Sequence, residues 1–244
     1  MQPTKLVQQN KVGALTLGGF IFLGLTMLGY LLANAVIEYK QFERTVTVKG
    51  LSEQEYNADI VLWPIQFIAA GNELETLYKT IEINTTKINE FLIKKGIEPE
   101  EISFSAPAIT DKSAQQYGNS AQYQYRYSAM QTVTVYSKKI AVARNIMGAL
   151  SDLGKQGIVF TGDNYQSQTE YIFTRLNDVK PAMVEEATRK AREVAEKFAS
   201  DSDSKLGKIK KAVQGQFSIR ARDKNNPHIK QVRVVSTIEY YLSD

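Results

Sequence analysis

Few residues of this chain have the side chains that catalysis usually needs. The 244 residues include no cysteine and one histidine, His228. This composition excludes thiolate nucleophiles, disulfides and cysteine-ligated metals, and it leaves one imidazole for any catalytic triad. The segment Ser202-Asp203-Ser204-Lys205 has the S-x-x-K spacing of serine–lysine enzymes, but the further motifs of those enzymes are missing. We therefore expect no enzymatic activity, no metal and no cofactor, and we identify no small-molecule substrate.

Positive charge gathers in residues 204–233. This segment holds nine basic residues and one acidic residue, whereas the rest of the chain from residue 38 onward is net acidic. Seven of its residues are candidate contacts for an anion or another subunit: Lys205, Lys208, Lys210, Lys211, Arg220, Arg222 and Lys224. Three interpretations stay open, namely a solvated surface, electrostatic matching between subunits, and contact with anionic lipid headgroups or another anion.

Aromatic residues offer two further candidates. Tyr123, Tyr125 and Tyr127 occupy alternate positions, a spacing that could stack a ligand. The same parity continues in apolar residues through 129–135, which favours a half-buried strand instead. Trp63 lies in another apolar stretch, where it is either a core residue or an exposed interface anchor.

Residues 12–37 form a run of 26 residues without a charge. A helix of that length crosses a hydrocarbon core of about 30 Å. The alternative is a secretory signal peptide cleaved after Ala35, because Ala33-Asn34-Ala35 fits the A-x-A pattern. We favour a retained anchor because the apolar run exceeds the usual signal-peptide core of about 7–15 residues.

The charges beside this run predict its orientation. Lys5 and Lys11 precede it without an acidic residue, whereas the charges in the linker 38–44 cancel. Residues 1–11 are therefore predicted to be cytoplasmic, and residues 45–244 periplasmic or otherwise extracytoplasmic. This location in a single-pass protein of the cytoplasmic membrane excludes nucleic acid as the expected partner.

Residues 45–244 are predicted to alternate pairs of strands with single helices. Strands are expected at 45–50, 56–70, 101–109, 122–136, 157–163, 167–175, 208–219 and 229–242. Helices are expected from a cap at Asn72 to Lys95, at 138–153, and at 178–200, where alanine recurs every fourth residue. Pro64 predicts a sheet edge or a bulge. Short links between neighbouring strands favour antiparallel pairing, so the predicted fold class is α+β with three helices after the transmembrane helix.

Several of these segments resemble one known family. They are VTVKG, ADIVLWPI, GIEPEEISFSAPAI, YQYRYSA before TVTVY, EEATRKAREVAEKFASD, KLGKIKKA and STIEYYL. In this order they are similar to the SIMPL domain family, which includes bacterial periplasmic immunogenic and oxidative-stress defence proteins. The resemblance covers about residues 45–244. It implies an extracytoplasmic α+β domain that self-associates, with no established enzymatic activity and no catalytic residues to assign.

The combined expectation is a membrane-anchored, non-catalytic protein that works as a homo-oligomer in envelope maintenance or stress defence. The alternative is a module that binds anions or lipid headgroups through residues 204–233.

Overall fold

The computed structural model describes residues 4–41, 44–114, 124–161 and 168–243. It confirms the α+β class, with an N-terminal apolar helix and antiparallel sheets. The chain divides into two compact units, of which unit 1 comprises Met1–Ser52, Val184–Gln216 and Val234–Asp244, and unit 2 comprises Glu53–Met183 and Phe217–Arg233. The predicted single domain at 45–244 thus contains parts of both units.

Helix α1 (Thr4–Gln41) contains the predicted membrane span. Its segment Leu15–Ile37 has a mean hydropathy of 2.1 over 23 residues, and none of it is buried. This segment is long and apolar enough to cross a membrane. Both hydrophobic cores are built from residues after Thr45, so a fragment 45–244 keeps every core contact without α1.

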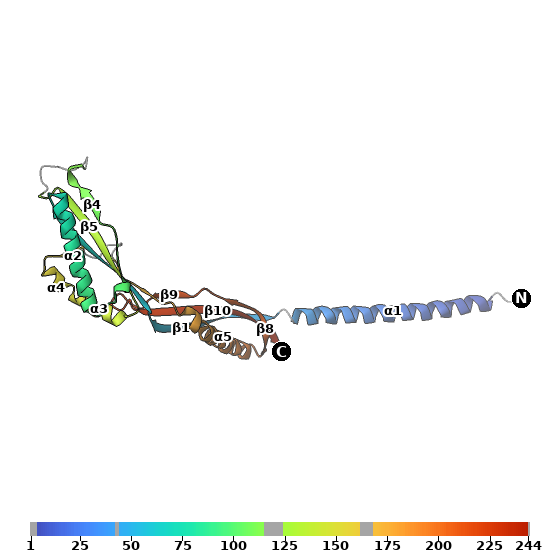
Figure 1. Ribbon diagram of the computed structural model, residues 1–244. Helices are drawn as coiled ribbons and strands as arrows, with labels where there is room; N and C mark the ends of the chain where they lie inside the picture. Colours follow the sequence, from blue (N-terminus) through green and yellow to red (C-terminus); the bar gives the residue numbers. More distant parts are fainter. Residues whose placement is uncertain (1–3, 42–43, 115–123, 162–167, 244) are drawn as a thin grey trace. The chain divides into compact units, whose positions relative to one another are not determined.

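Unit 1 is a helix packed on a sheet. The sheet order is β1 (Thr45–Asn57), β10 (Ile229–Ser243) and β8 (Lys205–Gln214), and the helix is α5 (Leu176–Asp201). Figure 1 shows the C-terminal part of α5 running along these strands. Its core joins Val48 of β1, Ala191 and Ala195 of α5, and Ile238 and Tyr240 of β10. The predicted alanine repeat therefore lies at the contact between helix and sheet.

Gly50 marks the closest approach between β1 and α5. A Cβ atom at Gly50 would lie 1.8 Å from the carbonyl oxygen of Ala187 and 2.6 Å from the amide nitrogen of Ala191. The neighbouring Ser52 hydroxyl donates a 2.6 Å hydrogen bond to Glu186. Only glycine leaves room for the helix backbone at this point.

Unit 2 is built around two long central strands. β2 (Ile60–Gly71) and β5 (Tyr127–Ser137) pair along their whole lengths in the sheet order β3-β5-β2-β6. The shorter strands are β3 (Ile102–Phe104), β4 (Ala108–Asp111), β6 (Val159–Phe160) and β7 (Glu170–Ile172). A fifth short strand, β9 (Ser218–Ala221), pairs with the first residues of β10.

Three helices cover the core of unit 2. They are α2 (Leu74–Lys94), α3 (Ile140–Ala149) and α4 (Ser151–Gly154), with 3-10 turns at Pro99–Glu101 and Lys112–Ala114. Helix α2 lies along β2 and β5 (Figure 1) and buries Leu77, Ile81, Ile88 and Leu92. These spacings of four and seven residues place the four side chains on one helical face.

Several predicted boundaries were wrong. β1 continues to Asn57, so the next strand begins at Ile60 and not at residue 56. The predicted strand pair at 157–163 and 167–175 does not form a ladder of its own, because β6 and β7 both pair with β2. Its predicted turn at Asp163-Asn164 lies outside the described residues. The helix predicted at 138–153 is divided into α3 and α4.

Of two local predictions, the sheet edge at Pro64 is confirmed among the described residues, and the helix cap at Asn72 was wrong. Pro64 lies inside β2 and pairs with β5 on one side. On the other side, pairing with β7 extends only to Leu62, and pairing with β6 covers only Phe67 and Ile68. Asn72 does not cap α2, whose N-cap is Glu73. Its side-chain oxygen instead accepts a 2.9 Å hydrogen bond from the backbone N–H of Arg126.

Asp59 fixes the turn between β1 and β2. Its carboxylate accepts hydrogen bonds from the backbone N–H of Thr174 at 2.7 Å, from the Thr174 hydroxyl at 3.1 Å and from Arg175 at 2.6 Å. Its own N–H donates to the carbonyl of Ile172 at 2.8 Å. One carboxylate therefore ties the turn to the segment after β7.

Candidate functional site

Strand β8 forms an edge of the unit 1 sheet. It pairs with β10 on one side, and no described strand pairs with its other side. The register shifts twice along this pair, between Glu239 and Tyr240 and between Tyr240 and Leu242. Gly207 lies at the second irregularity, where a Cβ atom would come within 2.9 Å of the Tyr241 carbonyl oxygen. Bulges of this kind increase the twist of an edge strand.

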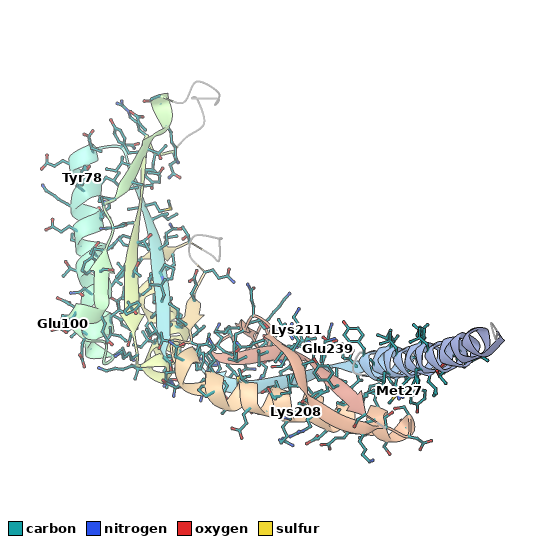
Figure 2. The ribbon with its side chains drawn as sticks, turned by 90° about the vertical axis from the view of Figure 1, so that its right-hand side faces the viewer. Met27, Tyr78, Glu100, Lys208, Lys211 and Glu239 are labelled. Carbon is teal, nitrogen blue, oxygen red and sulfur yellow. The ribbon has the colours of Figure 1, made fainter. Side chains whose placement is uncertain are left out.

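The lysines predicted as contacts lie along this edge strand. Lys208, Lys210 and Lys211 are exposed, and so is Lys205 at its start. Lys210 forms a 3.1 Å ion pair with Glu239, and its ammonium also lies 5.7 Å from the centre of the Tyr241 ring. Lys211 is the register partner of Glu239, and Figure 2 shows the two residues side by side, with Lys208 apart from them.

The carboxylate of Glu239 lies beside these lysines and is influenced by them. The hydrogen bond from Lys210, a second one from Thr45 and the charge of Lys211 lower the pKa of Glu239. Glu239 therefore stays ionised at neutral pH and compensates part of the positive charge of β8. Lys208 forms no ion pair within the described residues, so its charge is uncompensated there.

Two branched apolar residues of β8 are exposed beside its lysines. Ile209 lies between Lys208 and Lys210 and is 49% exposed, and Val213 lies two residues after Lys211 and is 50% exposed. An edge strand with half-exposed branched residues near cations offers a partner both apolar area and charge.

The other predicted basic residues belong to unit 2. The Arg220 guanidinium donates to the Gln231 side chain at 2.8 Å, and Arg222 forms ion pairs with Asp223 at 2.9 Å and Glu55 at 3.5 Å. Lys224 is exposed. The hydrogen bond from Arg222, with others from Asn225 and Asn226, lowers the pKa of Asp223 to about 2. Arg220 and Arg222 are therefore held by their own unit, and residues 204–233 are divided between the two units.

The remaining candidates have structural roles. Trp63 is 4% exposed and belongs to the unit 2 core, which supports the core alternative over the interface anchor. β5 begins at Tyr127, which packs against that core; Tyr125 precedes the strand and is 41% exposed, and Tyr123 lies outside the described residues. The Ser202 hydroxyl donates to the Phe198 carbonyl at 2.9 Å, as expected for a polar helix end. No group of metal-ligating residues occurs within the described ranges.

Sequence reasoning missed one feature, a cavity of about 580 Å³ in unit 2. It lies at the start of α3 and is lined by residues that include Lys138, Arg144 and His228. Lys138 and Arg144 are separated from His228 by more than 80 positions in the sequence. Pairing of distant residues leaves no local pattern in a sequence, so only the fold reveals it.

Comparison with known families agrees with this architecture. Residues 46–236 match the family described as SIMPL, protein of unknown function (DUF541). The chain belongs to the SIMPL family. The matched SIMPL region begins one residue after β1 starts and ends inside β10, so it takes in both sheets and leaves out α1. No curated protein matches the chain.

The SIMPL region thus contains both candidate sites. Strand β8 and the cavity beside α3 lie within residues 46–236. The family description names no reaction, so the function has to be argued from these two sites.

Proposed function

We propose that this SIMPL protein is a membrane-anchored, extracytoplasmic and non-catalytic assembly factor that works as a homo-oligomer in envelope maintenance or stress defence. Helix α1 is its anchor, with the N-terminus in the cytoplasm. The exposed apolar span Leu15–Ile37 supports retention in the membrane. Cleavage after Ala35 would instead produce a mature chain that starts at Val36, and N-terminal sequencing of the purified protein distinguishes the two outcomes.

The proposal that the protein self-associates rests on the edge strand β8. Ile209 and Val213 expose about half of their surfaces close to the lysines of β8, and a second copy of the chain would cover them. Bulges and lysines on an edge strand oppose indiscriminate strand pairing, so the contact would be made by side chains and would depend on charge matching. The net acidic remainder of the extracytoplasmic chain supplies the opposite charge. Contact between different surfaces of two copies produces rings or filaments.

The assembly prediction is tested with the fragment 45–244. We expect oligomers at micromolar concentration in sedimentation velocity, and we expect higher salt to shift them toward monomer because salt screens exposed charges. The double variant Ile209→Ser/Val213→Ser should weaken association at least about tenfold, because it removes apolar area from the contact. Ile83→Ser is the control, since Ile83 is 55% exposed on α2, which belongs to unit 2.

Two results would contradict this proposal. One is a fragment that stays monomeric at every concentration and salt level. The other is equal weakening by the β8 variant and by Ile83→Ser, which would show that the association has no specific surface.

A second candidate function is contact between β8 and anionic lipid headgroups. The observation that favours it is the short covalent distance between α1, which ends at Gln41, and β1, which begins at Thr45. An extended chain advances about 3.5 Å per residue, so Arg44 lies within roughly 20 Å of the end of the apolar span. The Arg44 guanidinium donates to the hydroxyl of Ser204, the residue before β8, at 3.1 Å. With α1 as a retained anchor, these short distances support a position of the start of β8 near the membrane.

This candidate predicts that the fragment 45–244 co-sediments with anionic vesicles. Lys208→Gln/Lys211→Gln should weaken that binding about tenfold or more, since each lysine near an anionic surface contributes about 1 kcal/mol. Lys79→Gln/Lys155→Gln is the matched control, because both lysines are exposed and lie in or beside helices of unit 2. Equal binding to neutral vesicles would rule out the lipid-headgroup function.

A further inference from the structure

The cavity beside α3 brings together residues from three separate parts of unit 2. Asn57 ends β1, Lys138 follows β5, and His228 comes just before β10. The first turn of α3 and Arg144 in its second turn complete the polar part of the lining. None of the residues that line this cavity belongs to the edge strand β8.

The start of α3 lacks a cap. Its N-cap, Lys139, makes no side-chain capping bond, and the first intrahelical bond runs from the N–H of Ala143 to the carbonyl of Lys139 at 3.0 Å. The backbone N–H groups of Ile140, Ala141 and Val142 therefore have no acceptor among the described residues, and all three residues line the cavity. Free N–H groups at a helix start carry a partial positive charge.

Arg144 adds a side-chain donor to the same cavity, and His228 orients it. One guanidinium nitrogen of Arg144 lies 3.0 Å from Nε2 of His228. A guanidinium only donates, so Nε2 accepts and the neutral ring carries its hydrogen on Nδ1. Burial lowers the pKa of His228, and the charges of Arg144 and Arg222 lower it further, which keeps the ring neutral. Nδ1 is buried and has no partner among the described residues.

The described part of the chain neutralises the charges around the cavity only in part. Lys139 is paired with Glu98. Arg144 and Lys138, in contrast, form no ion pair with any described residue. Glu98 and Glu101 act on Lys139, and Asp223 acts on His228, but no described carboxylate forms an ion pair with Arg144 or Lys138 or accepts from the three amide groups. A dianion with several acceptor oxygens fits such a set of donors.

We propose that this cavity binds the phosphate group of a small phosphoester. The phosphate oxygens accept hydrogen bonds from the N–H groups of Ile140, Ala141 and Val142 and from Arg144. Lys138 contributes charge. A volume of about 580 Å³ exceeds what a phosphate alone fills and lies in the range of small-molecule sites. Ala58 and the side chain of Ile140 supply apolar surface for the organic part of the ligand.

The experiment is a titration of ¹⁵N-labelled fragment 45–244 with glycerol phosphate and, separately, with inorganic phosphate at constant ionic strength. We expect saturable chemical-shift changes at the amides of Ile140, Ala141 and Val142. Arg144→Gln should raise the dissociation constant at least about tenfold, because a charge-assisted hydrogen bond is lost. Arg189→Gln is the control, since Arg189 is exposed and paired with Glu193 in unit 1.

Two outcomes would overturn the site. One is the lack of saturable shifts at the three amides in wild type with either probe. The other is an unchanged dissociation constant in Arg144→Gln, whose native spectrum would show that the variant is folded.

Vesicles containing phosphatidic acid then distinguish the source of the phosphate. Stronger binding to these vesicles than to glycerol phosphate assigns the site to lipid headgroups, and the reverse assigns it to a soluble phosphoester. Both results support phosphate recognition, and neither depends on self-association through β8.

Discussion

Gly50→Ala is expected to lower the free energy of unfolding by about 3 kcal/mol or more, because unit 1 has no room for a side chain at this position. The added Cβ would lie 1.8 Å from the carbonyl oxygen of Ala187, which belongs to a helix backbone and cannot rotate away. β1 and α5 would have to separate. That separation would expose the contact between Val48 and the alanine residues of α5.

Urea denaturation followed by circular dichroism measures this loss. Gly148→Ala is the control, because Gly148 lies in α3 and a Cβ there would meet no atom within 4 Å. Alanine is a better helix former than glycine, so the control should gain about 0.5–1 kcal/mol. Equal unfolding midpoints for Gly50→Ala and wild type would show that β1 and α5 do not pack as closely as the structure has them.

Asp59→Ala is expected to cost about 2–3 kcal/mol at pH 7, because it removes the acceptor of several hydrogen bonds at once. The backbone N–H of Thr174 and the guanidinium of Arg175 would both lose their partner. Asp152→Asn is the control. Asp152 is exposed and paired only with Lys155 three residues later, so its loss should change the free energy of unfolding by less than about 0.5 kcal/mol.

The cost of Asp59→Ala should depend on pH. Burial raises the pKa of Asp59, but the hydrogen bonds from Thr174 and Arg175 outweigh it, so the pKa is lower in the folded state than its usual 3.8. A carboxylate of this kind stabilises the fold above the unfolded-state pKa, and its contribution is lost as pH falls through the folded-state pKa. The difference between wild type and Asp59→Ala should therefore be constant from pH 5 to pH 7 and shrink below about pH 4. A difference that does not change down to pH 2 would contradict the role of the ionised carboxylate.

The long helices and strands were predictable because their buried side chains recur at a regular spacing in the sequence. The alanine repeat of α5 and the spacing of Leu77, Ile81 and Ile88 in α2 identify buried helical faces from the sequence alone. The alternation in β2 likewise separates Trp63 and Phe67, which are buried, from Ile68 on the other face. The family resemblance was confirmed over residues 46–236.

The pairing partners of short strands were not predictable in this way. β6 has two residues and β7 has three, too few for a period to appear, and both pair with β2 across the sheet. Asn72 has the right side chain for a helix cap, but the N–H of Arg126 from a distant strand takes its oxygen. Tertiary contacts overrode the local preference in each case.

The two candidate sites differ in how far the sequence could predict them. The lysines of β8 are close in sequence, so their charge was apparent before the fold was known, whereas their pairing with Glu239 was not. The cavity at α3 depends on His228 lying beside Arg144, and on three amides left free by a missing cap. Neither feature can be recognised from the residue types or from their spacing in the sequence.

The order of strands in unit 1 constrains the moment at which its sheet can form. β1 lies at the edge of this sheet, with β10 as its neighbour, and the carbonyl of Arg44 accepts from the N–H of Leu242 at 2.8 Å. These partners are separated by almost the whole chain that follows α1, and distant pairing of this kind is slow. During synthesis β1 would stay unpaired until residues 229–243 had been added to the chain. Throughout that interval the unpaired strand is a target for chaperones and for misassembly with neighbouring chains.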